Sequence, residues 1–168
     1  EVGPTGRAIG VDMTPAMLEK ARANAARGEY SNVEFRLGEI EHLPVADASV
    51  DLIISNCVIN LSPDKPQVFR EAFRVLKPGG RVLVSDLVLT GPLDPAIQNS
   101  IDCYVGCVAG ASLKQDYLTM LRDAGFTDIA IVNESAYTVG ASALPDGGIE
   151  RAAYDAVVSV KVRAVKPA

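Results

Sequence analysis

Three of the predicted strands end in side chains that could do chemistry. The three ends read Gly10-Val11-Asp12, Gly38-Glu39-Ile40 and Ser55-Asn56-Cys57. Ligands of a parallel sheet bind beyond the C-terminal ends of its strands, so we expect these groups to face one site. A carboxylate placed like that of Asp12 can accept two hydrogen bonds from the vicinal hydroxyls of a ribose. Glu39 can accept one from an adenine amino group, and the next backbone N–H can face a ring nitrogen.

Each of these positions also has a purely structural interpretation. Asp12 would equally serve as a cap for the helix that follows it, because carboxylates accept from the free N–H groups of a first turn. A glutamate after a glycine, as at Glu39, is typical of a solvated turn, and Asn56 is of a type that often forms turns. A cysteine such as Cys57 is less usual in a turn. From these residues alone, both interpretations stay open.

The three cysteines are Cys57, Cys103 and Cys107, an odd number and too few for a disulfide scaffold. They predict a cytoplasmic protein with reduced thiols. Free cysteine is often buried and simply fills space, which is the favoured interpretation of Cys103. Cys103 and Cys107 would share one face of a helix, but Gly106 and Gly110 disfavour a continuous helix there. A structural zinc site is not indicated, because no Cys-x-x-Cys pair occurs.

Strand-like and helix-like patterns alternate along the chain, which favours an α/β fold with a mostly parallel sheet. The strand-like runs lie at 7–12, 33–37, 50–55, 81–89, 126–132 and 157–165, and the helical patterns at 14–28, 66–76 and 112–125. The runs at 50–55 and 81–89 are nearly continuous in apolar residues, as strands buried on both faces are. A turn is expected at 78–80, where a proline precedes two glycines. The last two strands lie close in sequence, which permits an antiparallel strand at one edge of the sheet.

The 168 residues correspond to one domain, 1–168, of ordinary globular composition. Hydrophobic residues make up 48% and charged residues 22% of the chain, enough apolar material for a sizeable core. The net charge of −5 and the lack of a basic stripe argue against nucleic acid as a partner. No apolar run approaches the ~18 residues of a spanning helix, so no membrane partner is expected.

The three strand ends together resemble those of class I S-adenosylmethionine-dependent methyltransferases. The resemblance covers nearly the whole chain and rests on four pieces, IGVDMTPAMLEKAR, FRLGEIEHLP, DLIISNCVINL and RVLKPGGRVLVSD. It implies a Rossmann-like sheet and S-adenosylmethionine as the cofactor. In that family the acid matching Asp12 holds the ribose, Met13 packs beside adenine, and Glu39 with Ile40 reads the adenine edge. The cofactor site that the resemblance implies comprises Asp12, Met13, Gly38, Glu39, Ile40 and Asn56.

The contexts of two cysteines are similar to one subgroup, the arsenite methyltransferases. The similarity lies in SNCVINL around Cys57 and GCVAGA around Cys107. In the subgroup the matching cysteines bind trivalent arsenic, a soft centre that prefers thiolates. The arsenic keeps a lone pair that can attack the sulfonium methyl, so the transfer depends on positioning rather than on a strong base. The resemblance thus implies Cys57 and Cys107 as catalytic and arsenic-binding residues, arsenite or its thiol conjugates as the substrate, and a thiol reductant as a partner.

One departure from the family pattern is large, because no strand–glycine loop–helix pattern is present for the cofactor's methionine end. Gly3 and Gly6 precede the first strand and follow none. We expect an N-terminally truncated catalytic domain that lacks the family's first strand and glycine loop and binds the cofactor weakly. In the family fold that strand lies between the strands matching 7–12 and 50–55. We expect these two strands either to close against each other or to protect the gap by self-association.

Two other functions stay open. A carbon methyltransferase acting on a quinone or similar small molecule would fit GEIEHLP and KPGGR equally well, and only the cysteines argue against it. A non-catalytic thiol module that binds arsenite would suit a chain without the glycine loop. If the arsenic interpretation holds, the sulfurs of Cys57 and Cys107 should approach each other. Cys57 should also be alkylated readily, because a metal-binding thiol must be accessible and able to ionise.

Overall fold

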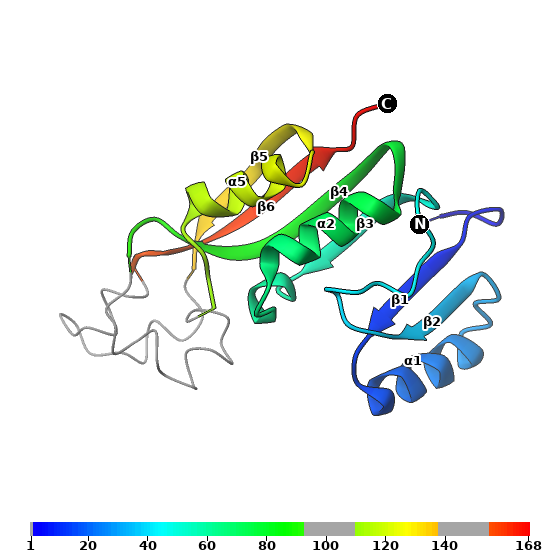
Figure 1. Ribbon diagram of the computed structural model, residues 1–168. Helices are drawn as coiled ribbons and strands as arrows, with labels where there is room; N and C mark the ends of the chain where they lie inside the picture. Colours follow the sequence, from blue (N-terminus) through cyan, green and yellow to red (C-terminus); the bar gives the residue numbers. More distant parts are fainter. Residues whose placement is uncertain (1, 93–109, 138–154) are drawn as a thin grey trace, which may run out of the picture.

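The computed structural model describes residues 2–92, 110–137 and 155–168, in which strands and helices alternate as predicted (Figure 1). The strands are β1 (Ala8–Asp12), β2 (Val33–Leu37), β3 (Val50–Asn56), β4 (Leu76–Leu89), β5 (Thr127–Ala136) and β6 (Val157–Val165). The helices are α1 (Pro15–Arg27), α2 (Lys65–Val75) and α5 (Lys114–Asp123), with a short 3-10 helix, η1 (Ile59–Leu61). The six predicted strands and the helices predicted at 14–28, 66–76 and 112–125 are confirmed, whereas most of the short helical pattern expected at 149–156 lies outside the described residues. β4 begins earlier than expected and β5 ends later.

The strands form two sheets in the described part of the chain. β1 pairs with β2 in parallel, which places Asp12 opposite Leu37. The larger sheet has the order β3-β4-β6-β5, in which β3 is parallel to β4 and β6 is antiparallel to both of its neighbours. The predicted Rossmann-like α/β class is confirmed. The last two strands form the expected antiparallel pair at one edge of this sheet, with β5 outermost; the strand that runs in the reverse direction is β6, which pairs with both β4 and β5.

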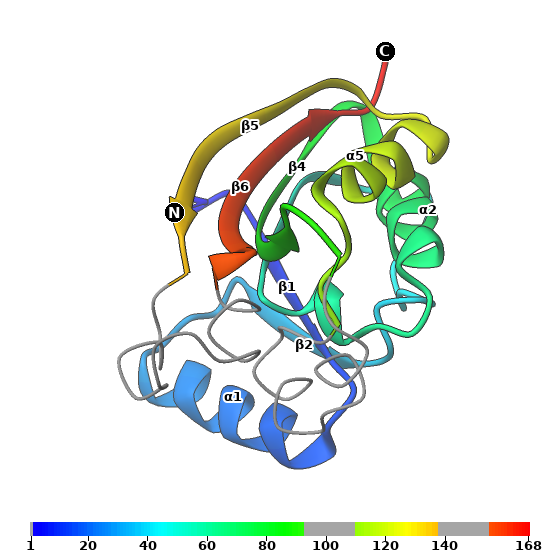
Figure 2. The ribbon, with the colours of Figure 1, turned by 90° about the vertical axis from the view of Figure 1, so that its left-hand side faces the viewer.

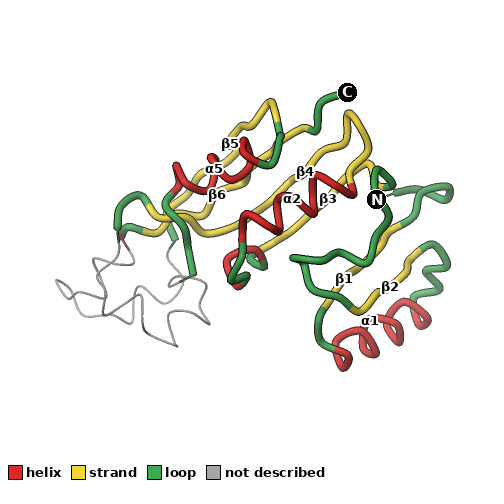
Figure 3. Tube along the Cα trace, in the orientation of Figure 1, coloured by secondary structure: helices red, strands yellow, loops and turns green. Residues whose placement is uncertain are grey.

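The core lies between the larger sheet and two helices. α2 and α5 lie side by side on one face of this sheet, whereas α1 covers the β1–β2 pair (Figure 2, Figure 3). Phe69 of α2 and Tyr117 of α5 meet edge to face with their ring centroids 5.2 Å apart, and both are fully buried. The helices therefore cover β4, whose residues Leu76, Val82, Val84 and Val88 belong to the same core. No helix in the described ranges is long and apolar enough to cross a membrane.

The outer face of β3 is exposed, which corrects the expectation that this strand is buried on both faces. Ile53 packs against the core under the helices. Leu52 and Ile54, on the other face, are 44% and 70% exposed. Within residues 2–92, 110–137 and 155–168, no strand pairs with the outer edge of β3. β3 thus carries apolar side chains beside an unpaired edge.

The predicted turn at 78–80 is present as an irregular stretch within β4. The register between β3 and β4 shifts between Val50 and Leu52. Gly79 has φ 76°, a left-handed conformation that glycine adopts without steric cost. Its N–H donates to the carbonyl of Lys166 at 2.9 Å, so the stretch is tied to the end of the chain. The irregularity lies at the edge of the sheet opposite to the predicted site.

Candidate active site

The C-terminal ends of β1 and β2 meet at Asp12 and Gly38. The N–H of Gly38 donates to the backbone carbonyl of Asp12 at 3.1 Å. Asp12 Oδ1 accepts from the N–H of Thr14 at 2.8 Å, while the hydroxyl of Thr14 makes no capping bond to α1. One carboxylate oxygen of Asp12 therefore shapes the turn into α1. The side chain is half-buried, and its second oxygen makes no hydrogen bond within the described residues, so a role toward a ligand is compatible with this structural one.

Four other predicted cofactor residues lie around Asp12. Met13 follows it and is 69% exposed. Gly38 lies against a proline ring, since a Cβ at this position would be 2.7 Å from Pro44 Cδ. Glu39 is exposed and Ile40 is half-buried against the core of the larger sheet. The structure thus gathers these residues at one corner, as expected, and their role in cofactor binding stays a prediction.

The loop that follows Ile40 is held to α2 by Arg74. The guanidinium donates to the carbonyls of Leu43 at 3.0 Å and Val45 at 2.9 Å, and to the carboxylate of Glu71 at 2.7 Å. Glu71 also accepts from the N–H of Leu43 at 2.8 Å. Its bond to Arg74 is the main reason that the pKa of Glu71 lies below its ordinary value. These bonds fix the loop directly after Glu39 and Ile40, the two residues predicted to contact adenine.

Cys57 lies directly after β3, on the larger sheet. Its N–H donates to the carbonyl of Ser85 at 2.8 Å, which places Cys57 beside Asp86 of β4. The side chain is half-buried, whereas that of the preceding Asn56 is exposed. Cys57 has φ 53°, a left-handed conformation that residues other than glycine rarely adopt. Strain of this kind clusters at functional sites, where surrounding contacts hold it in place.

Burial raises the pKa of the Cys57 thiol, and the nearby carboxylate of Asp86 raises it further. Both influences favour the protonated thiol over the thiolate. The side chain is partly accessible, as a reactive thiol must be, but burial and Asp86 both act against its ionisation, so the ready alkylation of Cys57 stays a prediction.

Asp86 is a feature of this site that the motifs did not reveal. Its side chain is fully buried, which raises its pKa to about 6. Oδ1 accepts from the N–H of Leu87 at 3.0 Å, and Oδ2 from the hydroxyl of Tyr117 at 3.3 Å. The backbone N–H of Asn60 also bonds to this carboxyl. An acid within the apolar run RVLVSDLVL was the available signal, since a charge inside a buried strand must be satisfied there.

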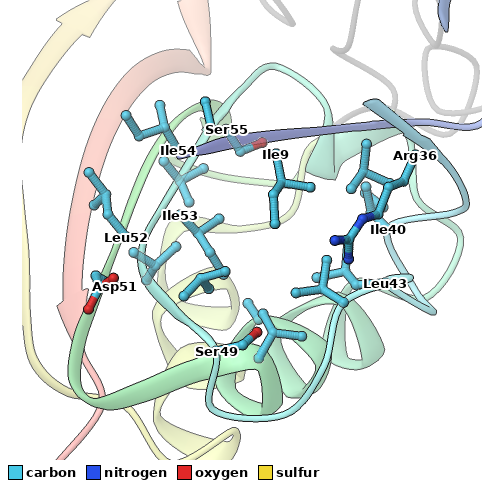
Figure 4. A pocket seen from close by; sticks show the side chains of 18 of the residues that line it. Ile9, Arg36, Ile40, Leu43, Ser49, Asp51, Leu52, Ile53, Ile54 and Ser55 are labelled. Atoms are coloured by element: carbon cyan, nitrogen blue, oxygen red, sulfur yellow. The ribbon is translucent and has the colours of Figure 1, made fainter. Parts of the chain in front are cut away.

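A cavity of about 1110 Å³ separates the two sheets (Figure 4). Its walls are mostly apolar and come from β1, the loop after β2, and β3. The side chains that show this in Figure 4 are Ile9, Ile40, Leu43, Leu52, Ile53 and Ile54. Asn56 lines the cavity from the β3 side, apart from the other predicted cofactor residues. The expectation that the strand at 50–55 closes against the strand at 7–12 is therefore wrong, because β1 pairs with β2, and β3 with β4, on either side of this space.

Cys103 and Cys107 lie outside the described residues. The expected approach of Cys57 to Cys107 thus stays a prediction. Within the described part of the chain, no group of three or more His, Cys, Asp or Glu side chains could hold a metal ion. The described residues offer Cys57 as the thiol of the site.

Comparisons with known proteins agree with this architecture. The chain matches the family model of the methyltransferase domain over residues 1–125. It is 50% identical over all 168 residues to the arsenite methyltransferase of Halobacterium salinarum. It is 35% identical over 121 residues, 68% of this chain and 47% of the relative, to the demethylmenaquinone methyltransferase of Lactococcus lactis. A solved structure, the arsenic(III) S-adenosylmethionine methyltransferase of Chlamydomonas reinhardtii, matches 99% of the chain with a TM-score of 0.84 at 36% identity.

These relatives are longer than the chain. It spans 42% of the length of the Halobacterium salinarum relative and 57% of the Chlamydomonas reinhardtii chain. The resemblance to arsenite methyltransferases and the class I fold are nevertheless confirmed, because both matches cover essentially the whole chain. On the match of its first 125 residues, the chain belongs to the methyltransferase domain family.

Proposed function

We propose that this chain forms the adenosine-binding and arsenic-binding parts of an S-adenosylmethionine-dependent arsenite methyltransferase. The observation that carries the proposal is the placement of Cys57, a half-buried thiol in a strained conformation at the C-terminal end of β3. The other predicted ligand corner lies at the ends of β1 and β2, across a cavity from β3. Identity of 50% to an arsenite methyltransferase over the whole chain supports the assignment.

The corner at Asp12 fits the adenosine half of S-adenosylmethionine. Asp12 offers a carboxylate oxygen for ribose hydroxyls, and Gly38 beside it lets the ring of Pro44 pack directly against the backbone. Met13 offers an exposed apolar surface for a base to pack on, and Glu39 an exposed acceptor. These residues would bind and orient the cofactor. When bound, S-adenosylmethionine supplies a methyl group on a positively charged sulfur.

On this proposal Cys57 binds trivalent arsenic together with Cys107. An As–S bond forms as the thiol proton leaves with a hydroxyl of arsenite as water, so the raised pKa of Cys57 does not prevent binding. The lone pair that stays on arsenic is the nucleophile, and no general base is needed. Arsenic passes from the trivalent to the pentavalent state when it is methylated. A thiol reductant is therefore the further partner that a complete cycle requires.

The second candidate function is methylation of a carbon atom in a quinone or similar small molecule. The demethylmenaquinone methyltransferase of Lactococcus lactis, 35% identical over 68% of the chain, favours it. That reaction would use the Asp12 corner in the same way but gives Cys57 no role. A non-catalytic arsenite-binding module would use Cys57 but not the Asp12 corner. Separate titrations with the two ligands therefore discriminate the three functions.

The experiment measures arsenite and S-adenosylmethionine binding on the same preparation. Alkylation of Cys57 by iodoacetamide is followed by peptide mass spectrometry during an arsenite titration, with Cys57→Ser as the matched blank. Cofactor binding is followed by calorimetry. We expect arsenite to protect Cys57 and the cofactor to bind weakly but measurably. Cofactor binding without arsenite protection would support the carbon methyltransferase, and protection without any cofactor binding would support the thiol module.

A further inference from the structure

The buried carboxylate of Asp86 lies where three hydrogen-bond donors converge. These are the N–H of Leu87, the hydroxyl of Tyr117 and the backbone N–H of Asn60. An ionised carboxylate only accepts hydrogen bonds, and its two oxygens have room for about four. An amide of the same shape would turn its NH2 group toward a donor. A carboxylate can accept from all three donors at once, with the hydroxyl of Tyr117 acting as a donor.

Two hydrogen bonds of Asn60 join β4 to the segment that follows Cys57. The backbone N–H of Asn60 bonds to Asp86, and the side-chain amide of Asn60 donates to the carbonyl of Leu87 at 2.7 Å. Asn60 is fully buried and lies within η1. The turn from Cys57 to η1 is thus attached to β4 on both sides: through Cys57 itself, by its N–H bond to Ser85, and through Asn60.

These hydrogen bonds to β4 help to hold Cys57 in a sterically unfavourable backbone conformation. A residue with a Cβ is strained at φ 53°, and such a conformation persists only where the surroundings hold it. β3 can hold the residue from the N-terminal side, but the C-terminal side depends on η1. Asp86 binds η1 at Asn60 and is itself oriented by Tyr117 from α5. Burial of this carboxylate is costly, which the rise of its pKa to about 6 reflects, so its retention calls for a role.

We infer that Asp86 is a positioning residue for Cys57: through Asn60 and Tyr117 it holds the 57–61 turn so that the thiol keeps one orientation at the end of β3. The inference rests on the proposed function for its arsenic-binding consequence, but the turn itself can be tested without arsenic. A fixed thiol loses little freedom when it binds, and this raises affinity for a ligand that must meet two thiols in one geometry.

The test compares Asp86→Asn and Tyr117→Phe with Asp51→Asn, which removes a surface acid of β3 that pairs with Lys77. Hydrogen exchange of the 57–61 amides is measured first, beside the urea midpoint of the whole chain. We expect exchange to quicken about tenfold in Asp86→Asn and about threefold in Tyr117→Phe, the effects of a charge-assisted and an ordinary hydrogen bond. Asp51→Asn should leave exchange unchanged. If Asp86→Asn does not fold, Tyr117→Phe keeps the carboxylate and decides alone.

The second readout is the concentration of inorganic arsenite that half-protects Cys57 from iodoacetamide. It should rise about tenfold in Asp86→Asn and about threefold in Tyr117→Phe while the chain stays folded, a change that loss of bulk stability would not produce. Unchanged exchange at 57–61 in folded variants would overturn the inference. Faster exchange at 57–61 that is fully explained by a lower urea midpoint of the whole chain would overturn it too. If arsenite does not protect Cys57 even in the unaltered chain, the proposed function fails, and the exchange result still decides the role of Asp86.

Discussion

The Asp12 corner and the Cys57 turn are built in opposite ways. At the corner, Met13 and Glu39 are exposed, and Asp12 uses one carboxylate oxygen on its own turn. At the turn, Cys57 is strained and half-buried, and a fully buried carboxylate lies beside it. A corner with exposed groups can adapt to a flexible nucleoside. A turn held by buried hydrogen bonds can present one thiol in one geometry. Holding it in this way requires a buried carboxylate, which costs free energy of folding.

Removal of the Cys57 thiol should have the largest effect. Cys57→Ser should weaken arsenite binding by roughly 10²–10⁴-fold, because a second thiol on the same chain acts at a high effective concentration that one thiol alone cannot supply. Equilibrium dialysis with inorganic arsenite measures the change, and Cys103→Ser is the matched cysteine control. Cofactor binding at the Asp12 corner should not change. If Cys57→Ser binds arsenite as tightly as the unaltered chain, Cys57 is not a ligand of the arsenic.

The cost of the buried carboxylate can be measured as a pH dependence of stability. The pKa of Asp86 is raised from 3.8 to about 6, so its favourable contribution is complete below about pH 4 and is lost as the pH rises through 6. The loss amounts to at most about 3 kcal/mol of the free energy of unfolding. Urea titrations from pH 4.5 to 8 should show the stability of Asp86→Asn rising relative to the unaltered chain as the pH increases. A difference that stays constant with pH would mean that the carboxylate does not titrate in this range.

Loss of the negative charge of Asp12 should weaken cofactor binding while the chain stays folded. Asp12→Asn keeps an oxygen for the N–H of Thr14 but loses the acceptor-only carboxylate. We expect S-adenosylmethionine to bind about tenfold more weakly, with arsenite protection of Cys57 unaffected. Calorimetry measures the first and peptide mass spectrometry the second. Asp123→Asn, an exposed acid at the end of α5, serves as the control. Equal cofactor affinity in both variants would contradict the ribose role of Asp12.

The apolar edge of β3 should give the smallest effect. We propose that the chain self-associates through this edge, where Leu52 and Ile54 are exposed beside the cavity between the sheets. Ile54→Lys should weaken association by about 1 kcal/mol, since it replaces an apolar side chain that is 70% exposed in the isolated chain. Sedimentation velocity follows the change. Val132→Lys on the edge strand β5 is the control, and if it disrupts association instead, the contact lies at the opposite edge of the sheet.

The sequence predicted the corner better than the turn. Asp12, Gly38 and Glu39 follow predicted strands, and parallel pairing of β1 with β2 brings such ends together by rule. The role of Asp86 depends on η1 and on Tyr117 from α5, contacts between residues 26 and 31 positions apart that no local pattern encodes. The place of β6 inside the sheet is equally non-local. The positive φ of Cys57 follows from the way η1 is attached, which the run SNCVINL does not reveal.

Mass mapping of the arsenite-loaded chain can show whether Cys57 and Cys107 hold one arsenic atom between them. The chain is loaded with inorganic arsenite, digested without reductant, and searched for peptides joined through arsenic. We predict one arsenic per chain that links the peptides of Cys57 and Cys107 and is lost in either serine variant, while Cys103 stays open to iodoacetamide. Bound arsenic that leaves Cys57 free to be alkylated would contradict the account.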